Sequence, residues 1–150
     1  MITNFEEFLQ RIIASVFSMK PMALKSSEKQ MSYAEILNEK NHSKLTDKMI
    51  EKEVKDLLKK DIESINKYLI KNFKLDLSKQ KNWKQFKECF SRRHILIHNN
   101  IYPDEQYRKD TGYKGKYTRL QIEKLYLDRS ISLYRKFGKI VNDFIVSKYS

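Results

Sequence analysis

The scarcity of chain-breaking residues is the feature that most constrains the fold of this sequence. Its 150 residues include only three glycines and two prolines, which favours long helices over the many turns of a β protein. Apolar residues recur at helical spacing along most of the chain, and no segment alternates convincingly with the period of two that a half-buried strand requires. We therefore predict an all-α compact bundle of four to five helices, forming a single domain over residues 1–150.

The first half of the chain is expected to hold two of the main helices. A helix over residues 4–18 begins at a capping-box pattern, Thr3 to Glu6, and stops at Pro21. Residues 46–73 are predicted to form one long helix, bent near Lys60 and Asp61. Between them, residues 19–44 are the least readable segment, with a short helix possible only after the Ser32–Glu35 pattern and with His42 expected in a solvated loop.

The second half is expected to hold a connector, a helix, a long loop and a closing helix. Leu75 and Leu77 in the connector are predicted to dock onto the core, and a helix follows over residues 81–99. Residues 101–117 are expected to form a long polar and aromatic loop or a small hairpin. The C-terminal helix is predicted to start at a capping-box pattern, Thr118 to Gln121. A long loop in a compact domain is often functional.

The charge of the chain points to a class of partner. Thirty-one Lys and Arg against 19 Asp and Glu give a formal net charge of +12, and nucleic acid is the usual polyanion that such a domain attracts. A lysine-rich composition can also give a basic surface to a protein without such a partner. No run of eighteen apolar residues is present, so no membrane contact is expected. The acidic, amphipathic N-terminus is unlike a secretory signal, and the single Cys89 cannot form an internal disulfide. We therefore expect a reducing cytoplasm as the setting.

The segment CFSRRHILIHNN, residues 89–100, is the strongest candidate for a site. Trp83, Phe86, Phe90 and Ile97 define the core-facing stripe of its helix, and Arg93 falls inside that stripe. A guanidinium there costs several kcal/mol unless it is paired or lies at an interface.

His94 borders the same stripe, His98 lies one turn beyond it, and Arg92 is expected to point outward to solvent. Residues 95–97 make the helix apolar on all sides at this turn. We expect them to be covered by the chain's own helices and by a second copy of the chain. The alternative is structural: Arg93 pairs with a carboxylate, and the histidines complement the helix dipole.

The residues Arg93 to His98 resemble the R-x4-H signature of the HEPN superfamily, in which a polar residue usually follows the arginine. His94 fills that slot, and the motif lies on the penultimate main helix of an all-α chain. The resemblance implies a HEPN-like bundle that forms a homodimer, brings two motifs together and cleaves RNA without a metal or other cofactor. It assigns catalysis to Arg93 and His98, with His94 in support. Some toxin members carry a tyrosine two residues after the motif histidine, which a partner nucleotidyltransferase modifies, whereas this chain has Asn100 there and its nearest tyrosine is Tyr102.

The chemistry of these side chains fits RNA cleavage. Histidine can take the proton of the ribose 2′-OH or give one to the leaving 5′-oxygen near neutral pH, and Arg93 can stabilise charge on the phosphate. The expected products are a 2′,3′-cyclic phosphate and a 5′-hydroxyl. No Asp, Glu and His cluster with metal-ligand spacing is present in the sequence, so no metal site is predicted.

The loop after the motif adds aromatic and basic residues that suit unpaired RNA. An ordinary solvated loop, with its tyrosines held against the bundle, is the other interpretation. We expect RNA-binding or supporting roles for Arg92, Asn99, Asn100, Tyr102, Tyr107, Arg108, Lys114 and Lys116.

These features predict an endoribonuclease of a toxin or antiphage defence system, with an antitoxin or defence protein as a further partner. Two alternatives stay open: a non-catalytic HEPN-like module that binds RNA or a partner protein, and an all-α interaction domain that needs no RNA. In a further variant, the C-terminal helix assembles with another chain such as an antitoxin.

Overall fold

The computed structural model describes residues 3–98, 100–115 and 118–149, apart from the side chains of Thr3, Asn4, Ser26 and His98. Within these ranges the chain is helical and has no strand. This agrees with the predicted all-α class, but the described part of the chain holds seven α-helices, not four or five, and two 3-10 helices. Their bounds are α1 Thr3–Met19, η1 Pro21–Ser26, α2 Tyr33–Leu37, α3 His42–Leu58, α4 Ile62–Phe73, η2 Leu77–Lys79, α5 Trp83–His98, α6 Glu105–Thr111 and α7 Lys124–Tyr149.

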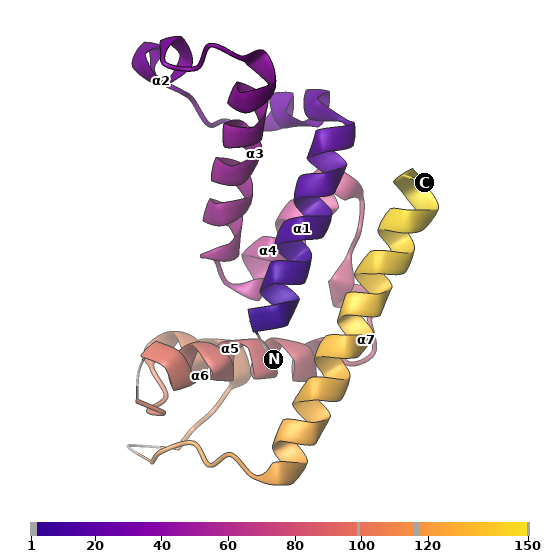
Figure 1. Cartoon of the computed structure of the whole chain (residues 1–150). Helices are drawn as coiled ribbons and strands as arrows, with labels where there is room; N and C mark the ends of the chain where they lie inside the picture. The colour runs from indigo at the N-terminus through magenta and orange to yellow at the C-terminus, as the bar shows by residue number, and fades with distance from the viewer. Residues whose placement is uncertain (1–2, 99, 116–117, 150) are drawn as a thin grey trace.

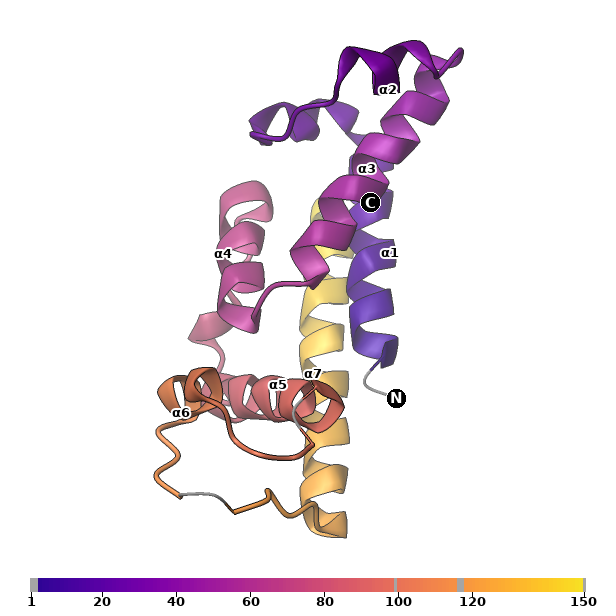
Figure 2. The same ribbon diagram turned by 90° about the vertical axis from the view of Figure 1, so that its left-hand side faces the viewer.

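The helices form an elongated bundle closed at one end by α5 and α6. Helix α1 packs between α3 and α7, and α5 contacts α4, α6 and α7. Figures 1 and 2 show α5 and α6 lying across one end of the bundle, with α2 at the other end. Among the described residues, no helix is both long enough and apolar enough to cross a membrane.

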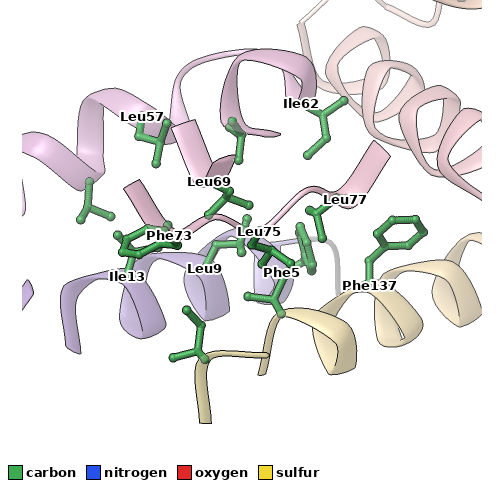
Figure 3. Close-up of a cluster of buried hydrophobic side chains, with 14 of the residues drawn as sticks. Phe5, Leu9, Ile13, Leu57, Ile62, Leu69, Phe73, Leu75, Leu77 and Phe137 are labelled. Carbon is green, nitrogen blue, oxygen red and sulfur yellow. The ribbon is translucent and has the colours of Figure 1, made fainter. Parts of the chain in front are cut away.

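The core is built from the apolar faces of α1, α3, α4, α5 and α7. Leu9 and Ile13 of α1 are buried against this core, as the periodicity predicted (Figure 3). The connector prediction is confirmed as well, because Leu75 and Leu77 are buried in the same cluster. The amide oxygen of Asn66, a buried polar residue, accepts the backbone N–H of Leu77 at 2.7 Å and so satisfies the connector backbone.

The single helix predicted over residues 46–73 is wrong, although the expected bend is where the chain breaks. Helix α3 ends at Leu58, and Asp61 caps α4 by accepting the backbone N–H of Ser64 at 2.9 Å. A side-chain cap that satisfies the free N–H groups of a new helix start makes a break favourable here. His42 is the exposed first residue of α3, not a loop residue. The Ser32–Glu35 capping box of α2 is confirmed in both directions.

The region after α5 differs most from prediction. Residues 101–117 include a helix, α6, in place of a long loop or a hairpin, and its N-cap Asp104 accepts the backbone N–H of Tyr107 at 2.7 Å. The Thr118 capping box is wrong, because α7 begins only at Lys124. Leu120 instead is buried with Ile95 and Tyr107, and its backbone N–H binds the carbonyl of Ile101 at 3.0 Å. Burying Leu120 under α5 therefore holds this segment in a non-helical path.

Candidate functional site

Arg93 is held by an ion pair with α1. Its Nη2 donates to Oε2 of Glu6 at 2.7 Å, and its Nη1 donates to Oε1 of the same carboxylate. The Arg93 and Glu6 side chains are only 16% and 21% exposed. Arg93 therefore faces the chain's own interior, as its place in the stripe predicted, and its partner is the carboxylate of the structural alternative.

Two buried polar atoms near this ion pair remain unsatisfied. Nε of Arg93 and the hydroxyl of Tyr134 have no hydrogen-bond partner among the described residues. Burial raises the pKa of Tyr134 above its ordinary value, so its hydroxyl stays protonated at neutral pH. Unsatisfied buried donors are uncommon in folded proteins. The surroundings of Arg93 are therefore unusual, because they hold two such atoms beside a largely buried ion pair.

The core-facing side of α5 turns along its length. Phe86 and Phe90 are buried as predicted, but Ile97 is 57% exposed and Ile95 is fully buried. The predicted stripe is wrong at this end, because Ile95 packs with Tyr107 and Leu120 in a second, smaller cluster below α5. The described chain therefore covers residues 95–97 on one side only.

Arg92 points inward, which contradicts the prediction that it faces solvent. Its Nε donates to Oε1 of Glu88 at 2.6 Å and lies 3.3 Å from the hydroxyl of Tyr107. Its guanidinium also stacks 4.1 Å from the ring centre of Tyr126 on α7. The predicted core-facing stripe missed this orientation, because α6 and the start of α7 cover a side of α5 that the apolar pattern assigned to solvent.

Glu88 is the centre of this polar cluster. Its carboxylate accepts hydrogen bonds from the hydroxyls of Tyr107 at 2.7 Å and Tyr126 at 3.0 Å, besides the bond from Arg92. Burial and the bond to Glu88 raise the pKa of Tyr107 to about 12. We call Glu88, Arg92, Tyr107 and Tyr126 the α5–α7 polar cluster, because it ties α6 and α7 to α5.

His94 is exposed and lines a pocket beside α5. Helix α5 continues to His98, one turn beyond His94, but the His98 side chain lies outside the described residues. The predicted supporting residues Asn99 and Lys116 lie outside them too. Asn100, with a φ of 49°, and Ile101, with a φ of 73°, turn the chain sharply after α5.

The predicted RNA-binding loop uses several of its side chains internally. Tyr107 is buried, and the guanidinium of Arg108 donates to the backbone carbonyls of Gly115 and Pro103. Tyr102, 43% exposed, and Lys114 remain on the surface. The structure thus brings Arg92 and Tyr107 together. Arg93 pairs instead with Glu6 on α1.

Cys89 is a buried thiol in the core. Its Sγ lies 3.3 Å from the hydroxyl of Ser130 on α7, and burial raises the pKa of the thiol. A buried thiol with a raised pKa is a poor nucleophile at neutral pH. Among the described residues, no group of three His, Cys, Asp or Glu side chains is placed to hold a metal ion.

No family model, curated protein or solved structure matches the chain. The residues that pair with the motif were not found from the sequence. Glu6 was interpreted only as part of a helix cap, because no local pattern indicates a contact across 87 residues. Glu88 was not singled out, although its i,i+4 spacing to Arg92 is a signal that the sequence carries. Lys59 and Lys60, which line the same pocket as His94, carried no signal beyond their charge.

Proposed function

We propose that the chain is a HEPN-type, metal-independent endoribonuclease that acts as a homodimer in a toxin or antiphage defence system. The observation that carries the proposal is the R-x4-H spacing of Arg93 and His98 on one continuous helix of a +12 chain. Cleavage by attack of the ribose 2′-OH would leave a 2′,3′-cyclic phosphate and a 5′-hydroxyl. The setting proposed is the cytoplasm.

The histidines supply the proton transfers in this proposal. His98 exchanges the proton of the 2′-OH or of the leaving oxygen, since imidazole titrates near neutral pH. His94, exposed one turn earlier on α5, supports it. Two copies across a two-fold axis would place two such pairs around one phosphate.

The ion pair with Glu6 sets a condition on the role of Arg93. Both Nη atoms, which a phosphate would bind in bidentate fashion, already donate to the Glu6 carboxylate. Arg93 can bind the phosphate only where the phosphate displaces or shares that carboxylate. Glu6 therefore competes directly with substrate in this proposal.

Exposed apolar side chains beside the motif support pairing of two copies. Ile97 is 57% exposed and Tyr102 is 43% exposed, at and just after the C-terminal end of α5. Burying such side chains against a second copy would contribute about 25 cal/mol per Å² of apolar surface. An antitoxin or defence protein covering the same side chains would block the site.

A non-catalytic module that binds RNA or a partner protein is the second candidate, and the Arg93–Glu6 pair favours it. A guanidinium whose two Nη atoms both bind a carboxylate of its own chain can be explained by packing of α1 on α5 alone. The two candidates differ in what His98→Ala does. The experiment incubates wild type and His98→Ala with RNA in chelator, and measures the mass of each protein in solution. The first candidate predicts cleavage by a dimeric wild type and none by the variant, whereas equal RNA binding without cleavage by both supports the second.

A further inference from the structure

Glu6, in the first turn of α1, holds the arginine of the R-x4-H motif in a closed ion pair. Its carboxylate accepts a hydrogen bond from Nη1 of Arg93 and another from Nη2, the second at 2.7 Å. These are the two nitrogens with which an arginine binds a phosphate in bidentate fashion. While the pair is closed, the motif arginine is therefore not available to a substrate.

The closed pair leaves polar atoms around it unsatisfied. Nε of Arg93 and the hydroxyl of Tyr134 are buried and have no hydrogen-bond partner among the described residues. A buried donor without a partner raises the free energy of the state that contains it. The closed state is therefore held less firmly than its two hydrogen bonds alone would suggest, and an open state lies closer to it in free energy.

The start of α1 offers the Glu6 carboxylate a second position. The first four backbone N–H groups of a helix have no partner within the helix, and a carboxylate in the first turn is stabilised by them and by the helix dipole. Glu6 lies in that turn, three residues after Thr3, which is the spacing of a capping box. Helix α2 forms such a box between Ser32 and Glu35. Glu6 therefore has two competing partners, the guanidinium of Arg93 and the backbone at the start of its own helix.

The carboxylate can change partners without a movement of the α1 backbone. Phe5, the residue before Glu6, is buried in the core (Figure 3), and its ring centre lies 5.4 Å from that of Phe86 on α5 and 5.4 Å from that of Tyr134 on α7. These contacts hold the first turn of α1 beside α5. The Glu6 side chain is 21% exposed, so rotation of this side chain alone is sufficient to open the pair.

We propose that Glu6 is an autoinhibitory gate on Arg93, and that a phosphodiester of the RNA substrate opens it by displacing the carboxylate toward the start of α1. The inference rests on the proposed function and adds regulation to the same site. A site that is closed in most molecules binds its ligand with an affinity reduced in proportion to the open fraction. The gate therefore keeps the chain below its full affinity for substrate, and removing the carboxylate should raise that affinity.

The test compares the cleavage kinetics of wild type, Glu6→Gln and the matched control Glu7→Gln on a short unstructured RNA of mixed sequence in chelator. Both substitutions remove one negative charge from the first turns of α1, but Glu7 is exposed and makes no ion pair or side-chain hydrogen bond with another described residue. Glu6→Gln should lower KM about 10-fold with kcat unchanged, because two residues in one ion pair are coupled by roughly that amount. Glu7→Gln should change KM less than about 2-fold, since it tests charge alone.

A second variant tests the gate without changing charge. The carboxylate of Glu6→Asp is one methylene shorter, so it loses the bidentate contact with Arg93 but still suits the first turn of a helix. KM of Glu6→Asp should lie between the values of wild type and Glu6→Gln, with all variants compared at a temperature where urea unfolding shows them to be folded. An unchanged or higher KM in the two Glu6 variants, or an equal fall in Glu7→Gln, overturns the inference.

Binding of the same RNA in a His98→Ala background separates this inference from the proposed function. The strand stays intact there, and Glu6→Gln should tighten RNA binding by about the same 10-fold, whereas Glu7→Gln should not. Tighter binding by Glu6→Gln without cleavage by any protein supports the gate and overturns the ribonuclease function. Cleavage by the wild type with an unchanged KM in Glu6→Gln overturns the gate alone, and no RNA binding by any variant overturns both.

Discussion

Removing either partner of the Arg93–Glu6 pair should destabilise the fold by a measurable and similar amount. Arg93→Ala leaves the Glu6 carboxylate, 21% exposed, without its two hydrogen bonds, and Glu6→Ala leaves the guanidinium, 16% exposed, likewise unpaired. Breaking a fully buried ion pair costs about 3–5 kcal/mol, whereas exposed pairs contribute about 0–1 kcal/mol. Partial exposure places each single variant at about 2–3 kcal/mol.

The assay is urea unfolding of both single variants and of the double variant. The double variant should cost less than the sum of the two single variants by about 1–2 kcal/mol, because the two side chains share one interaction. For a domain of this length, 1 kcal/mol corresponds to roughly 2–4 °C in Tm, so each single variant should melt roughly 4–12 °C lower. Costs below about 0.5 kcal/mol, or strict additivity, would refute the reasoning that this pair joins α1 to α5.

The same variants separate a structural from a catalytic role for Arg93. Under the proposed function, Arg93→Ala loses about 100-fold or more in cleavage at a temperature where it is folded. Glu6→Ala keeps the guanidinium and should retain cleavage, since the competing carboxylate is gone. Equal losses of cleavage in the two variants, measured where both are folded, would make Arg93 a packing residue only.

Two further predictions concern the α5–α7 polar cluster and the end of α5. The pKa of Tyr107 is raised to about 12, so its contribution to stability is complete below pH 10 and is lost as pH rises toward 12. Tyr107→Phe should reduce this alkaline loss of stability in urea unfolding and should cost about 1–3 kcal/mol at neutral pH, because it removes a hydrogen-bond donor to Glu88. An unchanged alkaline loss would contradict the assignment. Ile95→Ala should lower the unfolding free energy by about 2–4 kcal/mol, because Ile95 is fully buried. Ile97→Ala, at a 57% exposed position, should change the unfolding free energy little but should weaken the proposed homodimer in sedimentation. Equal stability losses in the two variants would show that the exposed face is part of the fold.

The helices with a regular apolar stripe were predictable from sequence. Residues 4–18 and 81–99 correspond to α1 and α5 within a few positions, because apolar residues at a period near 3.6 indicate a helix, even where, as in α5, the buried face turns from one cluster to another. Leu75 and Leu77 were placed correctly because they are the apolar residues of an otherwise polar connector. Asp61 and Ser64 carried a local signal for a new helix start, and the unbroken periodicity on either side obscured it.

The orientation of the site residues was harder to predict, since it depends on contacts between distant segments. Arg92 was assigned to solvent because a helical wheel considers one core, whereas α5 packs against a second cluster through Ile95. The start of α7 was misplaced because burial of Leu120 outweighs the local capping pattern. The partner of Arg93 was a carboxylate 87 positions earlier, which no periodicity encodes.

Analysis of RNA ends after incubation in chelator tests the central claim most directly. The measurement compares wild type with His98→Ala and with Lys40→Ala/Lys44→Ala, each shown to be folded. The account predicts 2′,3′-cyclic phosphate and 5′-hydroxyl ends from the wild type and the lysine control, and none from His98→Ala. Equal cleavage by His98→Ala, or activity that the chelator abolishes, would contradict it.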